Sequence, residues 1–220
     1  MTEPAQALSE IREDIDRAAR IARRKGDDVT LIAVSKTRTP EEIAPLLAAG
    51  HRDFGENRVQ EAQAKWPELM AQYPDARLHL VGQLQSNKAE DAALLFDAIH
   101  SLDRPSLVAA LARAFARTGR SVPCFVQVNI GAEEQKGGCA IAGLPALLAE
   151  ARAAGLPVAG LMCVPPADVE PSPYFALLAK LAADSGLSGL SMGMSGDFEA
   201  AVKLGATHVR VGTALFGARD

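Results

Sequence analysis

A single lysine, Lys36, follows the first apolar run of the chain, which reads LIAVS over residues 31–35. A lysine at the carboxyl end of a buried strand is partly removed from water. Desolvation lowers the pKa of such an amine and makes it a better nucleophile toward a carbonyl group. Lys36 is therefore the first candidate for covalent chemistry, and a surface lysine just beyond a strand is the alternative that Lys36 alone leaves open.

A glycine-containing segment near the end of the chain, SMGMSGD (191–197), has the composition of an anion-binding loop. Its glycines allow backbone N–H groups to approach a ligand closely. We expect Ser195 to cap a helix that begins near Asp197, so that the N-terminus of this helix faces an anion. Met194 precedes Ser195 and belongs to the same candidate loop.

A second such segment, VRVGT (209–213), places Gly212 and Thr213 directly after the last predicted strand. In many barrels of alternating strands and helices, the loops after the seventh and eighth strands bind phosphate. A lysine together with a phosphate site indicates an aldehyde cofactor held as a Schiff base, namely pyridoxal 5'-phosphate. Two ordinary glycine turns are the alternative.

Further polar residues lie on or after the predicted strands. Arg210 stands between two valines, so it either donates to a ligand nitrogen inside the fold or forms a structural salt bridge, because burying it unpaired is costly. Asn57 follows the second strand, and His79 lies on the third. A lone histidine on an apolar strand is more often a hydrogen-bonded core residue than a catalyst. The remaining histidines are dispersed without metal-ligand spacing, so we expect no metal site; they are His51, His100 and His208.

The elements that must position these residues alternate along the chain. The pattern predicts an amphipathic N-terminal helix that stops at Gly26, and a helix opened by a capping box at Thr39 and Glu42, with Pro45 as a flaw in its interior. Short strands are predicted near residues 29–35, 51–54, 78–82, 97–101, 123–130, 158–162, 188–191 and 207–211.

Eight strands alternating with helices predict an α/β fold, a (β/α)8 TIM barrel with an extra N-terminal helix, formed by residues 1–220 as a single domain. A doubly wound open sheet is the alternative, but it usually has fewer strands. The first strand also leads into Lys36 and not into a GxGxxG loop, which argues against a dinucleotide site.

Composition excludes several classes of protein. The net charge of −4 gives no basic surface for nucleic acid, and no apolar run is long enough to span a membrane. The N-terminus lacks the basic and apolar regions of a signal peptide. The chain has 3 cysteines without a CxxC motif, which is typical of reduced thiols in the cytoplasm.

Several motifs taken together resemble the pyridoxal phosphate homeostasis proteins, formerly described as proline synthase co-transcribed proteins. The resemblance runs from about residue 31 to residue 219. The motifs that carry it are VSKT (34–37), FGEN (54–57), HLVGQLQSNK (79–88), GLM (160–162), MGMS (192–195) and VRVGTALFG (209–217).

The resemblance implies a barrel similar to the N-terminal domain of alanine racemase, with Lys36 as the Schiff-base lysine. It implies that Arg210 faces the pyridine nitrogen and that Lys136 corresponds to a second family lysine in a loop. The resemblance further implies cofactor-binding positions at Asn57, His79, Met194, Ser195, Gly212 and Thr213.

Two functions from different classes follow. The first is a protein of pyridoxal phosphate homeostasis that stores and delivers the cofactor without significant turnover, with apo forms of cofactor-dependent enzymes as possible recipients. The second is an amino-acid racemase of the alanine racemase type, which needs an acid and a base on opposite faces of the substrate. The chain ends soon after Thr213, and Tyr73 and Tyr174 lie in predicted loops, so we favour the carrier and expect a monomer. An aldolase whose substrate carries the phosphate is a third, weaker reading.

Overall fold

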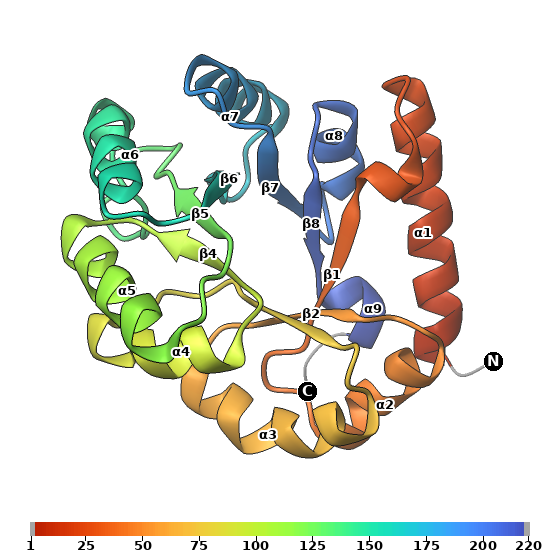
Figure 1. The fold of residues 1–220 in the computed structure, drawn as a ribbon. Coiled ribbons are helices and arrows are strands. Elements are labelled where there is room, and N and C mark those ends of the chain that lie inside the picture. The colour runs from red at the N-terminus through yellow and green to blue at the C-terminus, as the bar shows by residue number, and fades with distance from the viewer. Residues whose placement is uncertain (1–2, 218–220) are drawn as a thin grey trace.

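Eight parallel strands close into a barrel in the computed structural model, which describes residues 3–217. Each strand is hydrogen-bonded to its neighbours in chain order, and β8 pairs with β1 to close the ring (Figure 1). The predicted barrel is therefore confirmed. The strands are β1 (Thr30–Val34), β2 (Asp53–Glu56), β3 (Arg77–Leu80), β4 (Ala98–Leu102), β5 (Cys124–Gln127), β6 (Val158–Met162), β7 (Gly189–Met194) and β8 (His208–Val211).

The helices surround the strands (Figure 1). They are α1 (Glu3–Ile21), α2 (Pro40–Ala48), α3 (Val59–Gln72), α4 (Ala89–Leu95), α5 (Pro105–Thr118), α6 (Leu144–Ala153), α7 (Ser172–Asp184), α8 (Phe198–Lys203) and α9 (Thr213–Phe216). Short 3-10 turns precede β1, α4 and α6; they are η1 (Gly26–Asp28), η2 (Ser86–Lys88) and η3 (Ile141–Gly143).

The N-terminal helix α1 is confirmed and takes a place in the outer ring. Its apolar face, with Leu8, Ile11 and Ile15, is buried, and the helix packs beside α8 and α9 (Figure 1). Since α9 has only 4 residues, α1 covers the part of the barrel where β8 meets β1.

The predicted stop of α1 at Gly26 is wrong. The helix ends at Ile21, and the chain turns at Arg23, whose φ of 56° lies in the left-handed region. Arg24 then donates hydrogen bonds to the carbonyls of Val202 (3.2 Å) and Ala206 (2.9 Å). Docking of this arginine onto α8 fixes the turn before the glycine is reached.

The start of α2 agrees with its predicted capping box. The Thr39 hydroxyl accepts from the Glu42 amide, and the Glu42 carboxylate accepts from the Thr39 amide at 2.7 Å. The helix nevertheless continues past Pro45 to Ala48. A well-capped first turn and burial of Leu46 therefore outweigh the one backbone hydrogen bond that proline removes.

The barrel has an apolar outer layer and a partly polar interior. Large side chains such as Phe54, Trp66 and Phe96 are fully buried among strands and helices. The buried polar residues lie mainly on the strands or at their ends, and their contacts define the site described next; they include Ser35, Glu56, His79, His100, Gln127, Ser191 and Arg210.

Two further observations bear on the sequence predictions. Within residues 3–217 no helix combines the length and the apolar character needed to span a membrane. The three cysteines are free thiols, and burial raises the pKa of both Cys124 and Cys163 to about 12 and that of Cys139 to about 11.

Candidate cofactor site

A cavity of about 440 Å³ opens at the carboxyl ends of β1, β7 and β8. This volume lies within the roughly 300–1,000 Å³ typical of small-molecule sites. Seven of the predicted site residues line it: Lys36, Asn57, Met194, Ser195, Arg210, Gly212 and Thr213. Its other walls come from Gly196, a glycine of the predicted anion-binding segment, and from residues that the sequence analysis did not select, namely Val34, Arg38, Val81 and Val164.

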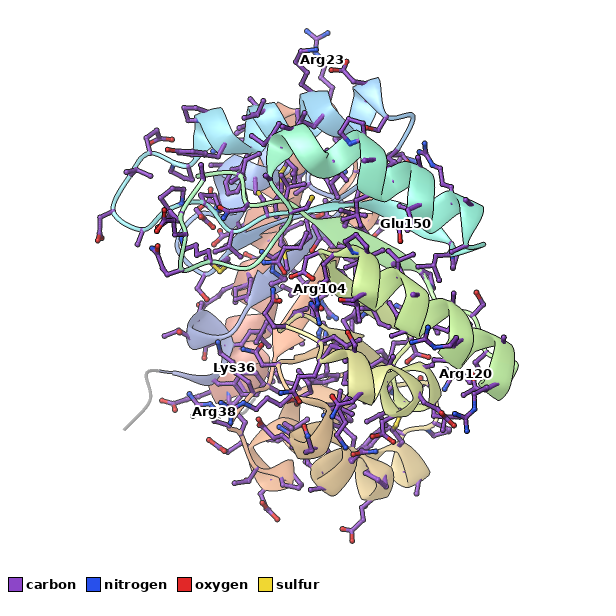
Figure 2. All side chains as sticks on the ribbon, turned by 90° about the vertical axis from the view of Figure 1, so that its left-hand side faces the viewer. Arg23, Lys36, Arg38, Arg104, Arg120 and Glu150 are labelled. Atoms are coloured by element: carbon purple, nitrogen blue, oxygen red, sulfur yellow. The ribbon has the colours of Figure 1, made fainter. Side chains whose placement is uncertain are left out.

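Lys36 enters the cavity from the end of β1, where it is half-buried. Figure 2 shows Lys36 and Arg38 next to one another, on the opposite side of the molecule from Arg120, which follows α5. Because side chains alternate along a strand, the preceding residue Ser35 faces the other way, and its hydroxyl donates to Glu56 at 2.6 Å. The alternation therefore selects position 36 for the cavity.

A buried ion pair supports the backbone on either side of Lys36. The Lys65 ammonium lies 2.8 Å from the Glu56 carboxylate, and both side chains are almost completely buried. The same ammonium donates to the carbonyl of Ser35 at 2.8 Å and to that of Arg38 at 3.2 Å. Lys65 thus holds both ends of the turn that carries Lys36.

The turn itself has an unusual backbone. Thr37 has a φ of 64°, which is uncommon for a residue with a branched side chain. Its amide donates to the Glu61 carboxylate at 2.5 Å, and Glu61 also pairs with Lys65 at 3.1 Å. Contacts from α3 therefore fix the conformation after β1. The sequence analysis missed Glu61 and Lys65, although their i, i+4 spacing on a predicted helix was visible.

Arg38 connects the Lys36 turn to the end of the described chain. It donates to the carbonyl of Gly217 at 2.8 Å, pairs with Glu42 at 2.9 Å and lies over the ring of Phe216 at 5.7 Å. The hydrogen bond from Arg38, together with the capping contact from Thr39, lowers the pKa of Glu42, the larger effect coming from Thr39. The loops after β1 and β8 are thereby joined at one side of the cavity.

Ser195 does not cap α8, contrary to the prediction. Asp197 precedes that helix, and its carboxylate accepts from the Met194 amide at 2.5 Å. The Ser195 hydroxyl instead accepts from the amides of Gly212 (3.2 Å) and Ala214 (3.4 Å). The two glycine-containing loops therefore meet at one hydroxyl group, with backbone N–H groups directed at a single point.

Gly193 allows β7 to make this turn. Its φ of 94° suits glycine, and a Cβ atom there would lie 2.6 Å from the Cβ of Ala201.

A glycine also explains how Asn57 reaches the cavity wall. A Cβ on Gly82 would lie 2.3 Å from the Asn57 carbonyl oxygen, so the loop after β3 packs against Asn57 only because residue 82 has no side chain.

Arg210 projects from β8 into the barrel, where only 5% of the residue is exposed. It donates to the Ser191 hydroxyl at 2.7 Å and to the Cys163 carbonyl at 2.8 Å. Burial lowers the pKa of Arg210 from its usual high value, but arginine stays charged in proteins. The structural salt bridge considered for Arg210 is not present among residues 3–217, because its recorded partners are neutral oxygens.

His79 does not line the cavity, in contrast to the prediction. It lies in the barrel interior, where its Nε2 is 3.0 Å from the Asp53 carboxylate and its Nδ1 is 3.1 Å from Nε2 of His100. Asp53 begins β2, so His79 is directed toward the amino ends of the strands, whereas the cavity lies at the carboxyl ends.

The description of the histidines as dispersed is also wrong in space. The ring centroids of His79, His100 and His208 lie 5.3 to 6.2 Å apart. Their positions on β3, β4 and β8 give no local spacing, and only the closure of the barrel brings them together. Within the described chain, no group of three or more possible metal ligands is found.

The second family lysine and the two tyrosines lie outside the cavity lining. Lys136, on the loop after β5, pairs with Glu133 at 2.6 Å and donates to the Pro165 carbonyl at 3.0 Å. Tyr73 follows α3 and stacks under Arg52 at 5.5 Å. Tyr174 lies in the first turn of α7 and not in a loop as predicted.

Comparison with known proteins places this site in a family. The family model for the alanine racemase N-terminal domain matches residues 7–220. The chain is 41% identical to the pyridoxal phosphate homeostasis protein of Pseudomonas aeruginosa, over 100% of this chain and 97% of that protein. This chain belongs to the pyridoxal phosphate homeostasis protein family.

Solved structures agree with this assignment. PipY of Synechococcus elongatus PCC7942, a 39% identical protein, superimposes in its form without pyridoxal phosphate with a TM-score of 0.87 over 97% of this chain and 99% of PipY. A structure of PipY with the cofactor bound gives a TM-score of 0.81 at 38% identity, over 97% of this chain and 100% of PipY. Alanine racemase of Clostridium difficile 630 shares the fold, with a TM-score of 0.68 at 15% identity, and the match covers 87% of this chain and 53% of the racemase.

Proposed function

We propose that this chain binds pyridoxal 5'-phosphate in the cavity at the carboxyl end of the barrel and acts in intracellular homeostasis of this cofactor, by storing and delivering it without significant turnover. One observation carries the proposal. Lys36, Arg210 and the Ser195–Thr213 loop pair, which are far apart in sequence, line the same cavity. The names of the relatives and the bound cofactor in PipY support it.

The residues of the cavity fit the parts of the cofactor. Ser195, Gly212 and Thr213 would hold the phosphate, since backbone amides and hydroxyl groups are suited to an anion. Arg210 would face the pyridine nitrogen, and Asn57 and Met194 would line the ring. When bound, the cofactor supplies an aldehyde, and the amine of Lys36 would attach it as a Schiff base.

The same residues argue against efficient turnover. A charged arginine against the pyridine nitrogen disfavours protonation of that nitrogen, which makes the ring a weaker electron sink. Racemisation also needs an acid and a base on opposite faces of the substrate. Neither Tyr73 nor Tyr174 lines the cavity that Lys36 enters.

The wider setting is part of the same proposal. Residues 1–220 would act as one domain and as a monomer in the cytoplasm, and apo forms of cofactor-dependent enzymes would be the recipients. The free thiols, of which those of Cys124 and Cys163 are buried, are compatible with a reducing compartment.

Reduction with borohydride followed by peptide mapping tests the proposal. The purified protein, loaded with pyridoxal 5'-phosphate, is expected to show a visible absorbance band that Lys36→Ala abolishes and to carry the pyridoxyl group on Lys36. Lys136→Ala serves as the matched control and should retain the band. Labelling mainly at Lys88 or Lys136 would refute the assignment. An aldolase, the third possibility, would show no such band as purified, before any cofactor is added.

A further inference from the structure

Arg210 is a buried cation, and the two groups that accept its hydrogen bonds are neutral oxygens. Groups further away must therefore help to stabilise its charge. Burying a charged side chain is costly unless it is well hydrogen-bonded. One of the two acceptors, Ser191, is itself fully buried on β7. The hydrogen bond that Ser191 donates therefore determines how its hydroxyl group is oriented toward Arg210.

A continuous row of hydrogen bonds leads from Ser191 across the barrel. The Ser191 hydroxyl lies 2.8 Å from Nδ1 of His100, and Nε2 of His100 lies 3.1 Å from Nδ1 of His79. Nε2 of His79 lies 3.0 Å from the Asp53 carboxylate. We refer to Arg210, Ser191, His100, His79 and Asp53 as the interior column.

The column joins the two ends of the barrel. Arg210 lines the cofactor cavity at the carboxyl ends of the strands, whereas Asp53 lines a second cavity of about 460 Å³ at their amino ends. The other oxygen of Asp53 pairs there with Arg77 at 2.6 Å. One oxygen of this carboxylate thus contacts His79 in the column, and the other contacts Arg77 at the mouth of the second cavity.

The Asp53 carboxylate, together with a single ring hydrogen on each histidine, fixes the direction of every bond in the column. A guanidinium can only donate and an ionised carboxylate can only accept. Arg210 therefore donates to Ser191, and Ser191 directs its hydroxyl hydrogen to Nδ1 of His100. His100 donates through Nε2–H to His79, which donates through Nε2–H to Asp53. The opposite direction would turn a lone pair of His79 toward the carboxylate.

The surroundings keep His100 neutral. His100 is fully buried and stacks on Phe125, with ring centroids 4.4 Å apart, while His208 faces it at 5.6 Å. Burial is the largest cause that holds the pKa of His100 well below its usual value. Burial alone would raise the pKa of Asp53, but hydrogen bonds from His79 and Arg77 lower it below its usual value.

We infer that Ser191, His100, His79 and Asp53 are positioning residues for Arg210, and that their one-way hydrogen-bond column keeps the Ser191 hydroxyl oriented to accept from Arg210 in the cofactor cavity. The inference rests on the proposed function only for the role of Arg210 toward the cofactor. The direction of the column is a property of the chain itself.

Nitrogen-15 NMR of the histidine rings tests the direction without any cofactor. The column predicts that His79 and His100 each carry their ring hydrogen on Nε2 and not on Nδ1. Protonation of His100 on Nδ1, or an imidazolium at either position, would overturn the column. Failure of the protein to bind pyridoxal phosphate would refute the proposed function and leave this result standing.

Two matched variants test the effect on the cavity. Asp53→Ala and Arg77→Ala both remove the ion pair at the mouth, but only Asp53→Ala removes the acceptor that ends the column. We expect Asp53→Ala to raise the dissociation constant of pyridoxal 5'-phosphate about fivefold and to mix the histidine tautomers, and Arg77→Ala to change the constant less than twofold.

Asp53→Asn is the conservative control, and the ring NMR of the parent protein still tests the column if the alanine variant does not fold. The amide oxygen of the asparagine can still accept from His79, so binding and tautomers should stay close to those of the parent protein. A purely structural role of Asp53 predicts that Asp53→Ala lowers the stability but leaves the affinity for pyridoxal 5'-phosphate unchanged. That result, or equal effects of Asp53→Ala and Arg77→Ala, would overturn the inference.

Discussion

The hydroxyl of Ser195 accepts a hydrogen bond from the amide of Gly212 at 3.2 Å, although the two residues lie on different loops. The contact joins the segment after β7 to the segment after β8. A second amide, that of Ala214, meets the same hydroxyl at 3.4 Å. The proposed phosphate-binding site is thus preorganised by a side chain that belongs to the site itself.

Substitution of Gly212 should impair this site more than substitution of Ser195. A Cβ atom on Gly212 would lie 3.4 Å from the Val34 carbonyl oxygen, so the larger side chain of Gly212→Val should displace the loop and strongly weaken retention of pyridoxal 5'-phosphate. Ser195→Ala removes one hydroxyl group and should cost on the order of 1 kcal/mol of binding free energy. Equilibrium dialysis measures both, and equal affinity for pyridoxal lacking the phosphate would contradict the assignment.

The buried pair of Lys65 and Glu56 should matter far more for folding than an exposed pair does. Lys65→Met leaves a buried carboxylate without its cation, which typically destabilises a protein by about 3–5 kcal/mol. Lys180→Met is the matched control, because Lys180 and Asp184 are largely exposed and such pairs contribute about 0–1 kcal/mol.

Urea unfolding gives both free energies of unfolding. The Lys65→Met protein should also bind the cofactor less tightly, since Lys65 holds the carbonyls of Ser35 and Arg38 beside Lys36. Similar losses in the two methionine variants would show that this buried pair has no special role.

The free energy of unfolding should fall as the pH drops below the pKa of the histidines in the unfolded chain. Burial lowers the pKa of both His51 and His208 from 6.5 to about 4. Above pH 6.5 these residues are neutral in the folded and unfolded states, and their contribution is complete. Between pH 6.5 and 4 the unfolded chain binds the additional protons, which costs up to about 1.4 kcal/mol per pH unit for each histidine.

Urea unfolding at pH 7.0 and 5.5 measures this loss. His51→Gln can keep the hydrogen bonds to Arg12 and to the Asp53 carbonyl but does not titrate, so its stability should depend less steeply on pH. An identical pH dependence in this variant and the parent protein would exclude His51 as a source.

Turnover of amino acids should be absent or very slow. Incubation of the loaded protein with L-alanine is expected to shift its absorbance spectrum without producing the D-enantiomer at the roughly 1–10³ per second of ordinary enzymes. Chiral chromatography measures the product. Turnover in that range would support the alternative function as a racemase. Loss of this turnover in Tyr73→Phe or Tyr174→Phe would identify the tyrosine that acts as the second base.

Local patterns in the sequence were sufficient to predict the order of elements and most of the cavity. Short apolar strands alternate with helices, and Lys36, Arg210 and Gly212 follow or lie on strands whose carboxyl ends meet in any such barrel. Strand boundaries were less accurate. Strand β7 continues to Met194, beyond the predicted 188–191, because the turn begins only after Gly193.

Contacts across the interior could not be predicted from the same patterns. His100 meets Ser191 from the opposite side of the barrel, and His79 points away from the cavity. Which inward-facing residues meet depends on the stagger between strands, and strand periodicity does not encode that stagger. For the same reason, Ser195 was predicted to cap the helix that follows it, whereas its hydroxyl contacts the amides of Gly212 and Ala214 after β8.

Closure of the barrel sets the order in which the cofactor cavity can form during synthesis. Ile32 of β1 pairs with Arg210 of β8, so the first and last strands of the barrel are neighbours. On the ribosome, Lys36 leaves the exit tunnel long before Arg210 and Gly212 have been made. A ligand that touches both Lys36 and Gly212 is therefore bound only after the strands from β1 to β8 have emerged and the first of them has paired with the last.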